Sequence, residues 1–246
     1  GAGLHVLCDK PMVCSVKHAK AVCDKVKKTR RVFVLSYQRH TLPPFIYMRE
    51  QVQNGAIGKV QYVTAFQSQN WLNATRGKWR QSMKLSGGGQ LNDSGSHLVD
   101  AILWVVGQPV VEVSAWCDNL GTEVDINSAV KMKFANGALG TMAVVGDAQV
   151  FWEDINIIGS KGTLIYRNNT VTHITGVGAP KLTVEFPPQA MNPVRNFIEC
   201  IQNKKAVNLI PPIWGLRVIE LTEAAWRSAA GQRGLPQRCA ACRGLP

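Results

Sequence analysis

Three titratable residues stand at helical spacing in a stretch that ends in an apolar run. Asp93, His97 and Asp100 lie between a run of three glycines, 87–89, and Gly107. Spacings of four and three residues put all three side chains on one face of a helix, while the leucine, isoleucine and valine residues of the stretch occupy the other face. An imidazole beside a carboxylate is suited to proton transfer. The stretch therefore predicts one helix that performs acid–base chemistry on a hydroxyl-bearing substrate.

Two other interpretations of this stretch remain open. An isolated histidine near a helix start is more often structural than catalytic. A divalent metal would need about three well-aimed protein ligands, and Asp100 suits a solvent-facing or supporting position equally well. The sequence therefore predicts no metal site here, and the choice between catalysis and structure depends on what else reaches the helix.

A lysine that follows the first apolar run is a second candidate for a catalytic residue. Leu4–Cys8 has the pattern of a buried strand and is followed by Asp9, Lys10 and Pro11. Open α/β sheets bind ligands at the carboxyl ends of their parallel strands. An ammonium there can hydrogen-bond a substrate oxygen and stabilise alkoxide character, although a lysine before proline is also a common exposed turn residue. We predict Lys10, Asp93 and His97 as the catalytic residues.

The elements that must position these residues fall into two groups. Apolar strand patterns at 4–8 and 31–37 flank a helical pattern at 15–28, which predicts a βαβ unit with parallel strands. A helix is expected after Pro43, and a polar, aromatic loop at 70–84. Alternating or apolar runs then predict strands, and two helices follow them near the end of the chain. The runs are 60–68, 110–117, 128–134, 138–145, 155–159, 163–166, 171–175 and 182–186. The fold class expected is a piece of a parallel α/β sheet followed by a domain with a large, mainly antiparallel sheet flanked by helices.

Length, composition and charge limit the class of protein and the partners that it could have. The chain has 246 residues, 46% of them hydrophobic and 18% charged, as in ordinary globular proteins. No apolar run approaches the roughly 18 residues of a membrane span, so no membrane partner is predicted. The net charge of +12 is spread over separate basic segments, which suits a solvated surface or anionic ligands such as a dinucleotide or sugar acid; no nucleic-acid motif accompanies it. Seven cysteines, an odd number, suit free thiols in a reducing compartment, and the pair Cys239 and Cys242 alone is weak evidence for metal or redox work.

Three motifs in order carry a family resemblance. They are Gly-x-His-Val-Leu-Cys-Asp-Lys-Pro at 3–11, Gly-Gly-Gly-x-x-x-Asp-x-Gly-x-His at 87–97 and Gly-Ser-Lys-Gly-Thr-Leu at 159–164. This combination resembles the Gfo/Idh/MocA family of oxidoreductases, the relatives of glucose–fructose oxidoreductase and inositol dehydrogenase. The resemblance implies a Rossmann domain that binds NAD or NADP and a sheet domain that presents the substrate. It divides the chain into a Rossmann remnant at 1–41, a substrate and oligomerisation domain at 42–232, and a tail at 233–246.

The resemblance also assigns site residues. Lys10 matches the lysine of the family's Glu-Lys-Pro motif, with Asp9 in place of the glutamate, and Asp93 and His97 match the helix pair. By the same resemblance the cofactor-binding residues are Asp9, Lys10, Pro11 and Gln38, and the substrate-contacting residues are Tyr37, Trp79 and Arg80. The implied reaction is hydride transfer between the nicotinamide and a secondary alcohol of a sugar or polyol. The implied assembly is a homo-dimer or homo-tetramer through the sheet face. The cysteine usage described above predicts a cytoplasmic location.

One family motif has no counterpart in this sequence. The Gly-x-Gly-x-x-Gly turn that receives a dinucleotide's pyrophosphate is not found at any strand-to-helix junction, since Val6 stands where the third glycine would follow Gly1 and Gly3. We therefore expect an N-terminally truncated member. Two other functions stay open: a non-catalytic sugar-binding or regulatory protein of the same fold, and an NAD-dependent glycosidase, whose Tyr-Pro-Thr-His motif is replaced here by Asp-Ser-Gly-Ser-His.

Overall fold

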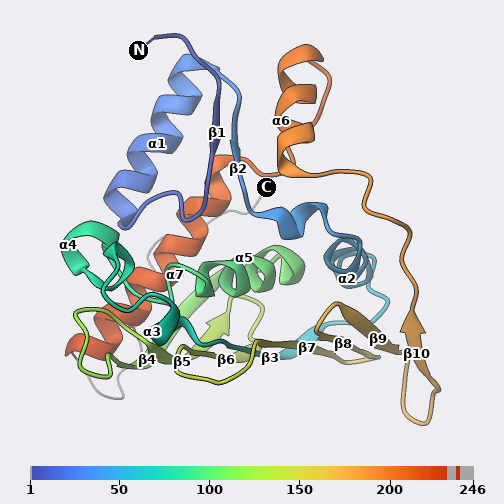
Figure 1. Ribbon diagram of the computed structural model, residues 1–246. Helices are drawn as coiled ribbons and strands as arrows, with labels where there is room; N and C mark the ends of the chain where they lie inside the picture. Colours follow the sequence, from blue (N-terminus) through green and yellow to red (C-terminus); the bar gives the residue numbers. More distant parts are fainter. Residues whose placement is uncertain (1, 232–236, 239–246) are drawn as a thin grey trace.

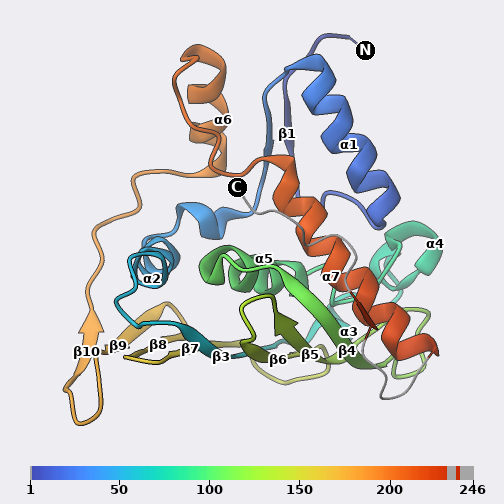
Figure 2. The ribbon, with the colours of Figure 1, turned by 180° about the vertical axis from the view of Figure 1, so that it is seen from behind.

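A large sheet forms the base of the molecule, and two further layers lie above it (Figure 1). The computed structural model describes residues 2–231 and 237–238. A layer of helices covers one face of the large sheet, and a small parallel sheet with two more helices stands above that layer (Figures 1 and 2). The predicted fold class is confirmed.

The small sheet is the predicted βαβ unit. Strands β1 (Val6–Cys8) and β2 (Phe33–Leu35) pair in parallel, and helix α1 (Val16–Thr29) connects them. The Ser15 side chain accepts a hydrogen bond from the backbone N–H of His18 and so caps the start of α1. Arg30, in the left-handed conformation, ends it. The parallel pairing brings the carboxyl ends of both strands to the same edge, and both strands run toward the helical layer (Figure 1).

The large sheet has nine strands in the order β10-β9-β8-β7-β3-β6-β5-β4-β11. Strands β3 and β6 pair in parallel, and the other neighbours are antiparallel. The strands are β3 (Val60–Ser68), β4 (Val110–Asp118), β5 (Asn127–Phe134), β6 (Leu139–Val145), β7 (Trp152–Gly159), β8 (Thr163–Arg167), β9 (Thr170–Ile174), β10 (Lys181–Val184) and β11 (Gln237–Arg238). Every strand predicted from the sequence is present. In the predicted tail, only Gln237 and Arg238 lie among the described residues, so the Cys239 and Cys242 pair lies outside them.

Three helices cover one face of this sheet. Helices α2 (Pro43–Gln53), α5 (Gly95–Val106) and α7 (Pro212–Gly231) lie across it, while α6 (Pro193–Gln202) stands beside the small sheet (Figure 2). The opposite face carries no helix among the described residues. None of the described helices is long and apolar enough to cross a membrane.

The stretch predicted as a loop at 70–84 contains short helical turns. They are α3 (Trp71–Ala74), the 3-10 turn η2 (Trp79–Gln81) and α4 (Met83–Ser86), and another 3-10 turn, η1 (Gln38–Thr41), follows β2. Each has only three or four residues, so none is long enough to show an apolar periodicity in the sequence.

The central helix differs from its prediction in two ways. It starts at Gly95, so Asp93 lies in the turn that precedes it and not on the helix itself. Of its twelve residues, all of them described, only His97 is not fully buried. The predicted polar face therefore does not exist, because α5 lies between the sheet beneath it and other helices around it.

Candidate active site

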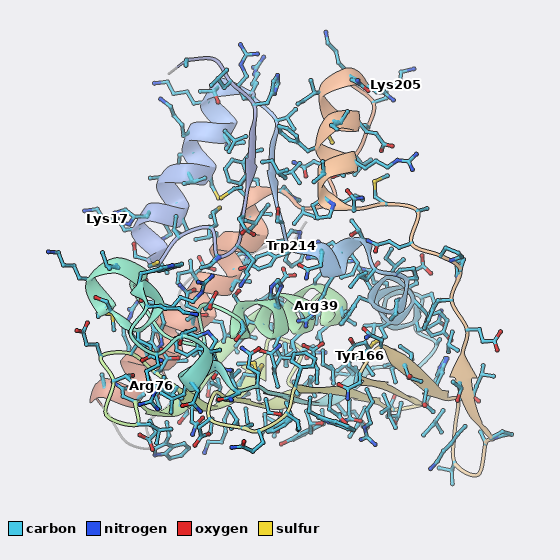
Figure 3. All side chains as sticks on the ribbon, viewed as in Figure 1. Lys17, Arg39, Arg76, Tyr166, Lys205 and Trp214 are labelled. Atoms are coloured by element: carbon cyan, nitrogen blue, oxygen red, sulfur yellow. The ribbon has the colours of Figure 1, made fainter. Side chains whose placement is uncertain are left out.

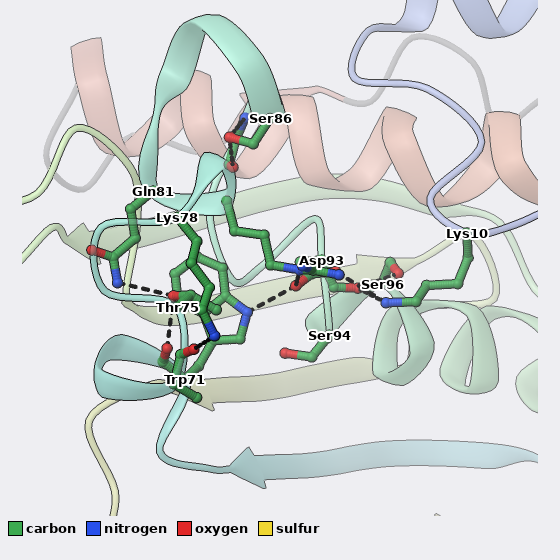
Figure 4. A network of polar contacts seen from close by, with 12 residues as sticks. Lys10, Trp71, Thr75, Lys78, Gln81, Ser86, Asp93, Ser94 and Ser96 are labelled. Carbon is green, nitrogen blue, oxygen red and sulfur yellow. Dashed lines mark hydrogen bonds and ion pairs between the residues drawn. The ribbon is translucent and has the colours of Figure 1, made fainter.

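Lys10 and Asp93 meet between the small sheet and the helical layer. The Lys10 ammonium donates to the Asp93 side chain at 3.1 Å from Oδ1 and to the Asp93 backbone carbonyl, also at 3.1 Å (Figure 4). Lys10 comes from the loop after β1, and Asp93 from the turn before α5, 83 residues later. Both side chains are about four-fifths buried. The structure thus brings together two of the three residues predicted to be catalytic.

Two further donors hold the second Asp93 oxygen. The indole N–H of Trp71 donates to Oδ2 at 2.8 Å and Arg80 Nε donates to it at 3.1 Å. Burial alone would raise the pKa of Asp93, but Lys10, Trp71 and Arg80 together lower it below its ordinary value. Asp93 is therefore an ionised carboxylate with a fixed orientation. Trp71 belongs to this cluster although the sequence analysis does not single it out as a site residue.

His97, the third predicted residue, lies one helical turn beyond Asp93 and is half-buried. Its Nδ1 is buried and has no hydrogen-bond partner among the described residues. Burial, and then the positive charges of Arg39 and Lys10, hold the pKa of His97 well below its ordinary value, although Asp93 opposes them. The imidazole is therefore neutral at neutral pH.

Asp100 does not join this group, which corrects the predicted three-residue stripe. It is fully buried, and its Oδ1 lies 3.0 Å from His40 Nε2. The other His40 nitrogen lies 3.0 Å from the backbone carbonyl of Leu209, and the ring stacks on Trp104. Asp100 thus links α5, through His40, to the chain segment before α7. The spacing of Asp100 from His97 could not predict this structural role.

Tyr37 is buried as well, with 1% of its surface exposed. Its ring meets the edge of His97, with 6.0 Å between centroids. Burial raises the pKa of Tyr37, so the phenol stays protonated. Tyr37 thus packs against the imidazole, and its contact with the substrate stays a prediction.

The remaining predicted substrate residues lie at the edge of the cluster. Trp79 is half exposed, and the Arg80 guanidinium stacks over its ring at 4.5 Å. Arg80 itself is held by Asp93. The pair forms a partly open wall beside Asp93.

Two of the predicted cofactor residues line a hollow of about 710 Å³. Asp9 and Gln38 contribute from the carboxyl ends of β1 and β2, and the first turn of α6 contributes Asn192 and Arg195. Lys10 points instead to Asp93, and Pro11 is not among the lining residues.

A buried ion pair lies close to His97. Arg39 (Figure 3) pairs with Glu153 of β7, and Gln67 of β3 donates to the same Glu153 oxygen at 2.9 Å. Arg39 Nη1 is buried without a partner among the described residues. This cluster of three residues could not be predicted from the sequence, because Arg39, Gln67 and Glu153 come from three separate elements.

The described residues hold no group of three or more histidine, cysteine or acidic side chains that could bind a metal ion. Within the same residues, Cys8, Cys14, Cys23, Cys117 and Cys200 are free.

A family profile described as the GFO/IDH/MocA C-terminal domain matches residues 45–165. Levoglucosan dehydrogenase of Pseudarthrobacter phenanthrenivorans is 24% identical over 193 residues, which cover 67% of this chain and 50% of the relative. D-glucoside 3-dehydrogenase of Escherichia coli is 32% identical over 111 residues, covering 45% and 31%. Residues 45–165 therefore form a domain of the Gfo/Idh/MocA family.

Solved structures of similar fold agree with this assignment. An oxidoreductase domain protein from Kribbella flavida superposes with a TM-score of 0.86 at 23% identity, covering 97% of this chain and 74% of that one. A levoglucosan dehydrogenase in complex with NADH and L-sorbose superposes with a TM-score of 0.83 at 21% identity, over 97% and 74%. At these identities the similarity shows the fold. The chain spans half or less of the length of the two curated Gfo/Idh/MocA relatives named above.

Proposed function

We propose that this Gfo/Idh/MocA protein is an NAD(P)-dependent oxidoreductase that transfers a hydride between a nicotinamide and a secondary alcohol of a sugar or polyol. The observation that carries the proposal is the contact of the Lys10 ammonium with Asp93, one turn before His97, beyond the carboxyl end of a parallel strand. The relatives named as sugar dehydrogenases support the substrate class.

His97 is proposed to take the proton of the reacting hydroxyl. A general base must be unprotonated at the working pH, and the lowered pKa of His97 keeps its imidazole neutral. Tyr37 packs against the ring and limits its motion.

Lys10 is proposed to hydrogen-bond the same substrate oxygen. A fixed positive charge stabilises the negative charge that develops on that oxygen in the transition state. Asp93 keeps the ammonium in place, and Trp71 and Arg80 keep Asp93 in place. Asp93 is thereby suited to orient Lys10, and its carboxylate can also accept a substrate hydroxyl.

We infer that the hollow beside Asp9 and Gln38 receives the nicotinamide end of the cofactor. Its volume of about 710 Å³ falls in the range of ligand pockets, roughly 300–1,000 Å³. The Asp9 carboxylate can accept hydrogen bonds from ribose hydroxyls, and Gln38 can offer an amide to a carboxamide. When bound, the nicotinamide supplies the hydride acceptor. No residue described here is assigned to the pyrophosphate.

A partner subunit is proposed to cover the bare face of the large sheet. Leu139 of β6 and Ile158 of β7 are exposed by 50% and 38%. Both stand opposite Tyr62 of β3 in the strand register, so the three form an apolar stripe across the middle of that face. Such a stripe is suited to a dimer interface. The free thiols of the described residues support a cytoplasmic location, since reducing compartments keep thiols free.

Turnover of a panel of sugars and polyols with NAD⁺ and with NADP⁺ tests the proposal. We expect reduced nicotinamide to accumulate, as followed by its absorbance, with at least one polyol. A protein that binds neither dinucleotide would contradict the proposal and would favour the non-catalytic sugar-binding alternative. Release of a sugar from a glycoside without net reduction of the cofactor would favour the glycosidase alternative.

A further inference from the structure

A buried carboxylate holds the turn that carries Asp93. Asp125 lies between β4 and β5 and is 5% exposed. Its Oδ1 accepts the backbone N–H of Gly89 at 3.0 Å, and its Oδ2 accepts that of Leu91 at 2.8 Å. Its own backbone carbonyl accepts the N–H of Gln90 at 2.8 Å. Three consecutive residues of the turn are therefore bonded to one residue of the sheet domain.

Trp226 of α7 fixes Asp125 from the other side. Its indole N–H donates to Asp125 Oδ1 at 2.8 Å. Among the described residues, the donors to this carboxylate are all neutral N–H groups and none is a cation, and burial raises the pKa of Asp125 despite them. A carboxylate kept in such a place without a cationic partner needs a reason beyond stability, because burying a charge is unfavourable.

The glycines of the turn show how closely it is held. A Cβ on Gly89 would lie 2.0 Å from the Asp125 carbonyl oxygen, and one on Gly88 would lie 2.3 Å from the Trp226 ring. Only glycine allows the backbone to approach this closely. Asp125 and Trp226 thus leave the turn little freedom to move.

Backbone hydrogen bonds connect the turn at 89–91 to Asp93 and to the start of α5. The Asp93 N–H donates to the Gly89 carbonyl at 3.0 Å, and the N–H of Gly95, the first residue of α5, donates to the Gln90 carbonyl at 2.8 Å. Any shift of residues 89–91 must therefore shift Asp93 and the start of the helix that bears His97. The contact between Lys10 and Asp93 depends on that position, since Lys10 comes from the other sheet.

We propose that Asp125 is a positioning residue: without touching the substrate, it fixes the turn at 89–91 and thereby sets the distance between Lys10 and Asp93. The effect on turnover rests on the proposed function, whereas the effect on the turn does not. Trp226 shares the task by orienting the carboxylate.

Asp125→Asn in the whole chain tests this inference. The amide nitrogen must face at least one backbone N–H, so the turn has to move away from it. We expect faster hydrogen exchange at the Gly89 and Leu91 amides and, because water gains access, a His97 pKa that rises toward its ordinary value in an NMR titration. With an active enzyme, kcat should fall roughly 10- to 100-fold because a displacement of about 1 Å at a catalytic group costs that much, while the KM for the dinucleotide changes less than about twofold.

Asp118→Asn is the matched control. Asp118 is the exposed last residue of β4 and accepts a backbone N–H from Leu120 at 2.9 Å, so Asp118→Asn should leave all three readouts unchanged. If Asp125→Asn does not fold, Trp226→Phe, which removes one donor and keeps an aromatic ring, should show the same changes at smaller size. A variant that loses thermal stability but keeps wild-type exchange at Gly89 and Leu91 and the wild-type His97 pKa would overturn the inference. If the wild-type protein turns over no substrate, the proposed function fails. Hydrogen exchange at Gly89 and Leu91 and the titration of His97 still test whether Asp125 positions the turn.

Discussion

Asp93 contacts three other residues of the candidate site. Its carboxylate receives Lys10 on one oxygen and Trp71 and Arg80 on the other, at 2.8 to 3.1 Å. Because two cations and an indole share one acid, neutralising that acid should disturb all of them together.

Asp93→Asn should lower kcat by roughly 100-fold, because the Lys10 ammonium loses its counter-charge and its orientation. Steady-state kinetics with the best polyol substrate checks this. Asp147→Asn, which removes an exposed carboxylate, serves as the control and should retain wild-type rates. Equal kinetics for Asp93→Asn and wild type would remove Asp93 from the mechanism.

His97 should set the acid limb of the pH profile. Because its pKa lies below the ordinary value of about 6.5, the rate of alcohol oxidation should rise with pH and level off before pH 7. The His97→Gln variant should lose this limb. A midpoint above neutral pH in the wild type would contradict the assignment.

The same shift predicts how stability depends on pH. The unfolded imidazole binds a proton near pH 6.5, whereas the folded one does so only at lower pH, so the unfolded state carries more protons between the two values. The free energy of unfolding should therefore fall as pH decreases through that window, and His97→Gln should weaken the fall. Denaturant titrations of both proteins at about pH 7 and about pH 5 measure this change in the free energy of unfolding.

At the scale of elements, the three glycines at 87–89 leave no room for a side chain, because a Cβ at each would lie within 2.5 Å of a neighbouring atom. Gly89→Ala should lower the free energy of unfolding by about 1–3 kcal/mol, the usual effect of overpacking, because its Cβ would clash with the Asp125 backbone. Gly231→Ala, at the end of α7 with open space around its Cβ position, is the control and should be near neutral. Thermal unfolding compares the two; equal effects would show that the close approach at Gly89 is unimportant.

The elements predictable from sequence were those with local signals. The apolar runs at β1 and β2, the helical spacing of α1 and the Ala135–Gly137 turn of the β5–β6 hairpin each specify a structure through neighbouring residues alone. The meeting of Lys10 with Asp93 was expected from the family resemblance. The burial of Asp100, the packing of Tyr37 and the Trp71 bond could not be predicted, because each depends on a partner from a distant element.

At the scale of the whole molecule, one face of the large sheet is covered by helices and the other is not (Figures 1 and 2). The apolar stripe of Leu139, Tyr62 and Ile158 crosses the bare face. A wide sheet that exposes such a stripe tends to bury it against another surface.

The double variant Leu139→Glu, Ile158→Glu should therefore convert an oligomer into a monomer in sedimentation measurements, because buried carboxylates oppose association. Val177→Glu changes the fully exposed residue between β9 and β10 and should leave the assembly unchanged. A wild-type protein that sediments as a monomer would rule out this interface.

In the proposed mechanism, the Lys10 ammonium acts on the substrate oxygen beside Asp93 and His97. The most direct measurement is the rate of reduced-nicotinamide formation by Lys10→Met, compared with wild type and with Lys17→Met, which removes an exposed charge from α1. Lys10→Met should be slower by at least about 100-fold at saturating substrate, because one preorganised charge at the developing oxyanion contributes that much, while Lys17→Met keeps the wild-type rate. Equal rates for the two lysine variants would contradict the account.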